Sequence, residues 1–339
     1  WYFFGIFAFV VLVNQLLTGI WLTMSYVPTG DGAFASVEYI MRDVDYGWLL
    51  RYMHSTGASA FFVVVYLHMF RGLMYGSYQK PRELIWILGM LVYVALMAEG
   101  FFGYILPWGN MSFWGGQVIV SLVGAIPIIG DSLAVWVRGD FNMSGVTLSR
   151  FFALHVVLVP LLLLVLVVLH VLALHEIGSN NPDGVDIKAK TDADGKPLDG
   201  MPFHPYLTVG KLPQIIIFMF LFATVIFFYP DGGGYLIEHP NYEPANPLKT
   251  PELIAPVWYY TPFYSMLRAA TFPLFGMDAK FWGLVTMAGA IVLPFILPWL
   301  DKSPVKSIRY KGLASKLFLA FFVIAFFILG YLGTVHPTP

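Results

Sequence analysis

Four of the eight histidines in this sequence lie inside long apolar segments, where a polar side chain is costly and usually marks a functional site. His54 and His68 share one segment, and His155 and His170 share another. An interval of fourteen residues advances about 21 Å along a helix and nearly completes four turns, so His54 and His68 share a face, one near each edge of a membrane. Zinc sites use ligands about three to five residues apart. The wider interval therefore predicts two separate binding sites.

Loop charge predicts how these segments cross the membrane, because Lys and Arg are retained on the cytoplasmic side. The loops after residues 47–75 and 281–300 are expected to be cytoplasmic from their basic residues, which are Arg71, Lys80, Arg82, Lys302, Lys306, Arg309, Lys311 and Lys316. Both histidine segments then run from outside to inside. We expect His54 to meet His155 at the outer level, and His68 to meet His170 at the inner level, as two bis-histidine sites.

Glycine repeats the same interval in two further segments. Gly5 and Gly19 are fourteen residues apart in the first apolar segment, as are Gly89 and Gly103 in the third. Glycine lets the backbone approach a flat macrocycle, although ordinary helix packing would explain either pair alone. The shared interval favours two haems. The chain has no cysteine, which excludes thiolate and thioether attachment.

Two arginines flank the predicted ligands. Arg51 and Arg71 each lie three residues from a histidine and near a membrane edge. A guanidinium there can pair with haem propionates. The alternative interpretation is ordinary positive charge at the end of a span.

His155 and His170 are fifteen residues apart, one more than the other pair. The extra residue would turn the second ligand by about 100° on a regular helix. Pro160 donates no backbone hydrogen bond and permits a kink or a one-residue π-bulge. We therefore predict a local break in the helix between His155 and Pro160.

The composition predicts a membrane protein. Of 339 residues, 58% are hydrophobic and 12% are charged, and the net charge of −1 argues against nucleic-acid binding. The expected fold is an all-α polytopic membrane protein with seven transmembrane helices and two b-type haems inside a bundle of the first four. The seven stretches, each long enough to cross about 30 Å of hydrocarbon, lie near residues 3–26, 47–75, 84–105, 147–174, 213–229, 281–300 and 317–333.

Three regions are expected along the chain. Residues 1–176 form the haem-binding four-helix region, with surface helices at 110–140 where glycine and proline interrupt shorter apolar pieces. Residues 177–212 form a cytoplasmic-side loop rich in turn-forming residues. Residues 213–339 form a C-terminal transmembrane region, whose segment 256–275 precedes the sixth span.

Several motifs resemble those of the cytochrome b subunits of cytochrome bc complexes. They are Gly103-Tyr104-Ile105-Leu106-Pro107-Trp108-Gly109, Met111-Ser112-Phe113-Trp114-Gly115, Arg150-Phe151-Phe152 before His155, Leu174-His175-Glu176, Gly178-Ser179-Asn180-Asn181-Pro182 and Phe203-His204-Pro205-Tyr206. The resemblance covers essentially the whole chain, and the fused length matches the bacterial respiratory type. Photosynthetic relatives split the chain in two and carry an extra haem on a cysteine, and this sequence has neither feature.

The resemblance implies a subunit of quinol–cytochrome c oxidoreductase (ubiquinol–cytochrome c reductase) in the bacterial inner (plasma) membrane, inactive alone. It implies a low-potential haem b at His54 and His155, a high-potential haem b at His68 and His170, and two sites for ubiquinone or a related quinone. In such a subunit, quinol is expected to be oxidised outside. One electron would go to a Rieske iron–sulfur subunit and the other through the haems to quinone inside, which contributes to proton translocation. A cytochrome c1-type subunit, lipids and a homodimeric complex are also implied.

The outer quinol site departs from the family pattern. The family's Pro-Glu-Trp-Tyr motif supplies a carboxylate, but here the residues are Pro256-Val257-Trp258-Tyr259. Valine cannot accept a proton, although quinol oxidation needs a proton acceptor. We hypothesise that Glu99 in the third span replaces the lost carboxylate; a neutral carboxyl packed between helices is the alternative. By resemblance, the site is lined by Phe101, Tyr104, Gly115, Pro256, Val257 and Tyr264.

The inner quinone site also departs from the pattern. His175 and Ser179 match residues that bind the quinone carbonyls, whereas Lys211 stands where the family has an aspartate. Lys211 would act through a water or a quinone anion, or the site binds quinone differently. The sequence leaves these possibilities open.

Two other classes of protein also carry buried histidines. A transporter or channel would use them as a proton relay. It would not need the two pairs of glycines at fourteen-residue spacing, Gly5 with Gly19 and Gly89 with Gly103, which we call the glycine ladders. No inverted repeat is found. A dihaem quinone-reactive membrane anchor of another respiratory enzyme would need the histidines without a proline-rich quinol pocket.

Overall fold

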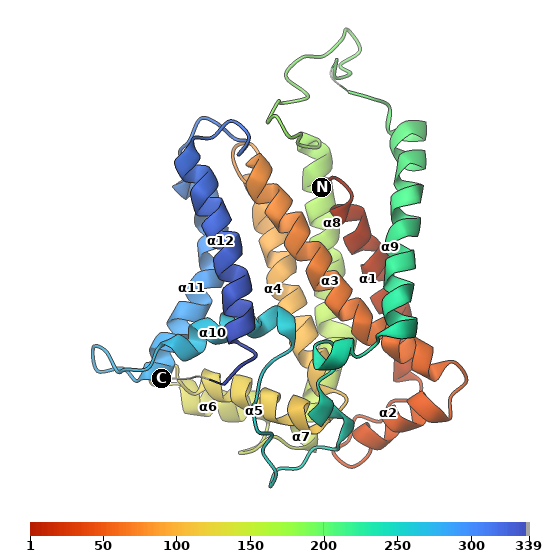
Figure 1. The fold of residues 1–339 in the computed structure, drawn as a ribbon, viewed down its shortest axis with the longest axis vertical. Coiled ribbons are helices and arrows are strands. Elements are labelled where there is room, and N and C mark those ends of the chain that lie inside the picture. Colours follow the sequence, from red (N-terminus) through yellow and green to blue (C-terminus); the bar gives the residue numbers. More distant parts are fainter. Residues whose placement is uncertain (199, 337–339) are drawn as a thin grey trace.

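The computed structural model describes residues 1–198 and 200–336 and is all-helical (Figure 1). The α-helices of this described part are α1 (Phe4–Thr23), α2 (Ala33–Arg42), α3 (Gly47–Tyr75), α4 (Glu83–Ile105), α5 (Asn110–Val123), α6 (Gly130–Arg138), α7 (Gly145–Ala153), α8 (Val159–Ile177), α9 (Thr208–Phe228), α10 (Thr261–Ala269), α11 (Ala279–Leu300) and α12 (Leu313–Leu332). Short turns are η1 (Leu154–Leu158), η2 (Phe203–Leu207), η3 (Gly232–Gly234), η4 (His239–Tyr242) and η5 (Trp258–Tyr260).

The prediction of seven transmembrane helices is confirmed. Seven helices in the described residues are long and apolar enough to cross a membrane, and the segment Gly145–Ile177, which joins α7, η1 and α8, has the highest mean hydropathy at 3.2. The fifth span differs from its predicted start, because α9 begins at Thr208 rather than at 213. Pro213 lies within its second turn, where the missing N–H leaves only one carbonyl without its usual partner.

The shorter helices gather at one end of the bundle. α2, α5 and α6 lie across the ends of the spans, together with the loop that follows α9 (Figure 1). Two helices therefore occupy the region 110–140 where surface helices were expected. They are too short to cross a bilayer, and glycine or a turn ends each one.

The two basic loops lie at the other end of the bundle and contact each other. Asp301, directly after α11, accepts hydrogen bonds from Tyr78 at 2.6 Å and Gln79 at 2.8 Å in the loop between α3 and α4, and pairs with Lys311 at 2.5 Å. Burial opposes ionisation of Asp301, but these donors outweigh it and lower its pKa to about 2. The loops after the second and sixth spans therefore share one face, as loop charge predicted.

The core forms where α1, α3, α4 and α8 pack together. Val11, Phe62 and Met90 are each 2% exposed or less, and Leu163 of α8 is 4% exposed. By contrast, large apolar side chains of α9 and α12 such as Phe220 and Phe318 are mostly exposed, as expected for helices that face lipid. The buried core of the molecule thus lies in the region that carries the four histidines.

The predicted break in the fourth span is confirmed. Residues Leu154–Leu158 form a π-helical turn between α7 and α8, and Val159 N–H bonds to Leu154 C=O. A π turn accommodates one extra residue within an otherwise α-helical span. It offsets the fifteen-residue interval and lets His155 and His170 face the same side.

Candidate functional site

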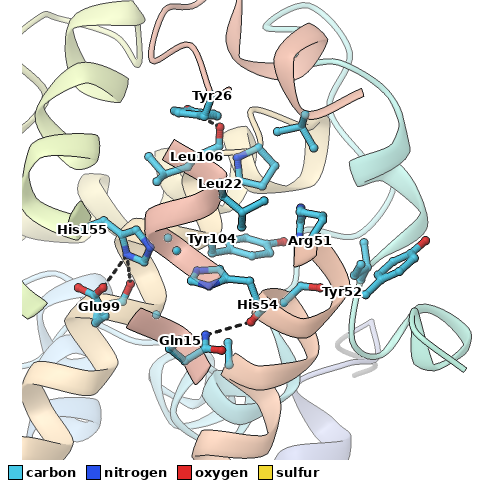
Figure 2. A pocket seen from close by; sticks show the side chains of 18 of the residues that line it. Gln15, Leu22, Tyr26, Arg51, Tyr52, His54, Glu99, Tyr104, Leu106 and His155 are labelled. Atoms are coloured by element: carbon cyan, nitrogen blue, oxygen red, sulfur yellow. Dashed lines mark hydrogen bonds and ion pairs between the residues drawn. The ribbon is translucent and has the colours of Figure 1, made fainter. Parts of the chain in front are cut away.

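The four histidines form two facing pairs, as their spacing predicted. The ring centroids of His54 and His155 are 6.1 Å apart with an interplanar angle of 89°, and those of His68 and His170 are 6.3 Å apart at 76°. Figure 2 shows the first pair from α3 and η1 facing each other across a cavity. Because the two spans run parallel, the first histidine of each span meets the first of the other, and the second meets the second.

The separation within each pair fits one haem iron. An imidazole nitrogen bonds a metal at about 2.0 Å and lies about 1.2 Å from its ring centroid, so two rings on opposite sides of one iron have centroids about 6.4 Å apart. The observed 6.1 and 6.3 Å agree with this distance. Direct hydrogen bonding between the rings would bring them closer.

Each of the four glycines lies against one histidine. A Cβ built at Gly19 would be 3.1 Å from Cε1 of His54, and at Gly89 it would be 3.1 Å from Cε1 of His170. A Cβ built at Gly5 would be 3.4 Å from Cε1 of His68, and a Cβ built at Gly103 would come closest of the four to its histidine, His155. The four glycines therefore leave room for the edges of the imidazole rings. Spacing alone did not show whether the glycines would contact the histidines or a macrocycle.

Hydrogen bonds at Nδ1 orient the outer pair. Thr18 Oγ1 lies 3.0 Å from His54 Nδ1, and His155 Nδ1 lies 3.0 Å from both the backbone oxygen and the carboxylate Oε1 of Glu99. Gln15 also donates to the backbone oxygen of His54 at 2.9 Å. Holding Nδ1 in this way leaves Nε2 free to face the cavity and bind a metal.

The cavity between the outer histidines has a volume of about 530 Å³, within the usual range for cofactor sites. His54, His155, Gly19, Gly103 and Arg51 line it, so the expected haem contacts at this level share one space. Glu99, Tyr104 and Val257 line the same cavity. One cavity therefore joins the proposed haem site to part of the predicted quinol site.

The other predicted quinol-site residues do not line this cavity. Gly115 lies beside Tyr104, since a Cβ there would be 3.5 Å from Cε1 of the tyrosine. Phe101 packs on Phe151 with centroids 5.8 Å apart, and Tyr264 donates to the backbone oxygen of Ile254 at 3.0 Å. Pro256 directly precedes Val257, which is 4% exposed.

The predicted inner-site residues are less closely connected. His175 is in the last turn of α8, Ser179 follows that helix, and Lys211 in α9 places its ammonium 4.2 Å from the ring centroid of Phe203 and 6.0 Å from that of Tyr2. The hydrogen bonds of the described residues do not join these three. Arg71 donates to the backbone oxygen of Asn180 at 2.8 Å, so it ties α3 to the same loop.

Sequence reasoning missed a half-buried acid in the outer loop. Glu238 lines the cavity and accepts hydrogen bonds from the Tyr104 hydroxyl at 3.2 Å and from Asn241 at 3.1 Å. In the sequence it is one of several acidic residues in the loop that follows the fifth span, and the motifs do not include it. No periodicity marks such a residue, and only its contact with Tyr104 reveals it.

Comparisons with known proteins agree with this architecture. The family model described as cytochrome b/b6/petB matches residues 1–178, and the model described as cytochrome b(C-terminal)/b6/petD matches residues 244–339. The cytochrome b of Allochromatium vinosum is 58% identical over 98% of this chain and 80% of its own length. The chain belongs to the cytochrome b family.

Other members of the cytochrome b family are also similar. The cytochrome b of Rhodospirillum rubrum is 48% identical over 98% of this chain and 77% of its own length. A chain in a solved structure titled hyperthermophilic respiratory Complex III superposes with a TM-score of 0.90 and 38% identity, covering 100% of this chain and 85% of that one. Membership confirms the resemblance to bacterial cytochrome b and the multi-pass membrane location, and it implies haem b as cofactor.

Proposed function

We propose that this chain is the cytochrome b subunit of a respiratory complex III, in which quinol is oxidised near the outer histidine pair and quinone is reduced near the inner pair. The observation that carries the proposal is the double bis-histidine geometry, with centroids 6.1 and 6.3 Å apart and a glycine against each ring. A solved complex III contains a chain with the same fold.

His54 and His155 would hold the low-potential haem, and His68 and His170 the high-potential haem. When bound, the haems supply one-electron chemistry. Thr18 and Glu99 fix the outer imidazoles by hydrogen bonds at Nδ1. Arg51 and Arg71 would place positive charge near the propionates, and buried Phe62 and Leu163 help to exclude water from the bundle.

The spacing of the two sites has an energetic consequence. Fourteen residues of α3 separate the levels by about 21 Å, roughly two thirds of the hydrocarbon thickness. Moving one charge across the whole membrane is worth about 2.3 kcal/mol per 100 mV. An electron that passes inward between the levels therefore works against the membrane potential and helps to build it.

Glu99 would accept a proton from quinol in the outer site. Its Oε1 contacts His155, whereas its Oε2 is buried without a hydrogen-bond partner in the described part of the chain and remains free to take a proton. Glu99→Gln is expected to slow quinol oxidation while both haems are retained. Unchanged oxidation in this variant would contradict the assignment.

His175, Ser179 and Lys211 would form the inner quinone site. The Lys211 ammonium lies over Phe203, at an aromatic surface on which a quinone ring could stack. Lys211→Met is expected to slow inhibitor-sensitive reoxidation of the inner haem and to leave outer quinol oxidation in the first turnover unchanged.

The chain would act only within its complex. One electron from each quinol leaves to a Rieske iron–sulfur subunit, which together with a cytochrome c1-type subunit carries the outward branch. Lipids and a second copy of the complex would cover the exposed apolar faces of spans such as α9 and α12.

Two measurements on the purified complex test the proposal. A dithionite-reduced spectrum must show two b-type haems for each chain, and a transporter would show none. Quinol-dependent haem reduction must then be blocked by an outer-site inhibitor. A dihaem anchor of another respiratory enzyme would show the haems but no oxidation of quinol linked to reduction of cytochrome c.

A further inference from the structure

Three acids line the outer cavity, and their surroundings differ. Glu38 pairs with Arg42 of its own helix at 2.5 Å, so a positive charge already lies beside it. Glu99 contacts the proposed haem ligand His155. Glu238 reaches the cavity from the loop between η3 and η4, and it contacts neither of the outer histidines through a hydrogen bond or ion pair.

Glu238 belongs to a three-membered hydrogen-bond cluster. Tyr104 donates its hydroxyl proton to Glu238 Oε2 at 3.2 Å, while the Asn241 amide lies 3.1 Å from the same carboxylate oxygen and 3.2 Å from the Tyr104 hydroxyl. The hydroxyl thus donates to a carboxylate and accepts from an amide. This arrangement directs the Tyr104 proton toward Glu238.

The cluster shares its cavity with the position where a carboxylate is missing. Val257 occupies the position at which the family's motif has glutamate, and Val257, Tyr259 and Glu238 all line the same cavity. The neighbouring residues His239 and Glu243 are exposed at the surface. Glu238 is therefore followed directly by a surface residue of the outer loop.

We propose that Glu238 accepts a proton from quinol through the Tyr104 hydroxyl, and so serves as the outer-site carboxylate that position 257 lacks. The quinol O–H bond breaks as an O–H bond forms on Tyr104, and the Tyr104 proton moves to Glu238 Oε2. The electrons leave by the two routes of the proposed function, on which this inference rests. With Glu99, the chain then has one carboxyl for each of the two quinol protons.

The ionisation of Glu238 suits this role. Burial raises its pKa to about 7, although hydrogen bonds from Tyr104 and Asn241 oppose the shift. The titratable groups that face it are Tyr104 from α4 and Tyr259 from η5. Because only the ionised form accepts a proton, quinol oxidation should rise with pH through about 7 and level off above it.

The test compares Glu238→Gln with the parent complex and with Glu252→Gln, an exposed acid in the same outer loop. Inhibitor-sensitive quinol oxidation is measured from pH 5.5 to 9, and haem content is measured by reduced spectrum. Glu238→Gln is expected to lower kcat by about 100-fold, the usual contribution of a proton acceptor, and to remove the rise near neutral pH. Glu252→Gln should match the parent.

The outcomes separate this inference from the proposed function. A parent complex without inhibitor-sensitive quinol oxidation overturns the proposed function itself. A parent that turns over, beside a Glu238→Gln variant with the same kcat and pH profile, overturns only the role of Glu238. If Glu238→Gln fails to assemble with both haems, the variant Tyr104→Phe is measured instead, because it keeps the Glu238 carboxyl and removes the hydroxyl that relays the proton. A Tyr104→Phe variant with the parent's rate and pH profile also overturns the inference.

Discussion

Alanine at the four ladder glycines should damage the haem sites in a graded order. Carbon atoms in ordinary contact are about 3.5–4.0 Å apart. At Gly19 and Gly89 the new Cβ would be 3.1 Å from an imidazole carbon, so the ring must move by roughly 0.4–0.9 Å. At Gly5 the distance is 3.4 Å and the required movement is small, whereas Gly103 leaves the least room.

Movement on this scale exceeds the roughly 0.2 Å tolerance of a metal–ligand bond. We therefore expect Gly103→Ala to lose the outer haem, Gly19→Ala and Gly89→Ala to shift the midpoint potential of the outer and inner haem respectively, and Gly5→Ala to resemble the parent. Reduced spectra and redox titrations of the purified complexes measure both effects.

The control is Gly289→Ala in α11, where nothing lies within 4 Å of the new Cβ. Alanine is intrinsically about 1 kcal/mol better than glycine inside a helix, so a general loss of helix stability cannot explain a defect. Equal behaviour of all four ladder variants, or two haems with unshifted potentials in Gly103→Ala, would refute the reasoning.

Three further predictions follow from the spans and their loops. Val157 is 55% exposed within the π turn, and its deletion should restore an α-helical interval of fourteen residues between His155 and His170 and preserve both haems. Deletion of Val63 in α3 is the control and should cost one haem. The reverse result in reduced spectra would contradict the role of the turn. Glu99→Gln should raise the midpoint potential of the outer haem, because a carboxylate at Nδ1 makes the ligand more basic, and an unshifted redox titration would argue against that contact. Asp301→Asn should destabilise the inner loops by about 2 kcal/mol, since three hydrogen-bonded partners lose a charged acceptor. A variant that is thermally inactivated at the same temperature as the parent would contradict this stabilising role of Asp301.

Much of the fold could be predicted from the sequence because lipid imposes simple rules. Helix is the only way to satisfy the backbone of a single apolar span, so seven apolar stretches fixed seven spans. The interval between His54 and His68 and the extra residue before His170 likewise determined the pairing and the π turn, since helical geometry converts spacing into direction.

The tertiary structure alone decided what each helix face meets. Spacing could not show that Gly19 would touch His54, or that the Glu99 carboxylate would contact His155 as well as line the cavity. Glu238 is the clearest case, because a loop residue has no period and its partner Tyr104 is 134 positions away in the chain. The sequence determined the four histidines and their levels, whereas the folding of the outer loop onto the end of α4 decided that Glu238 reaches the cavity beside the outer histidines.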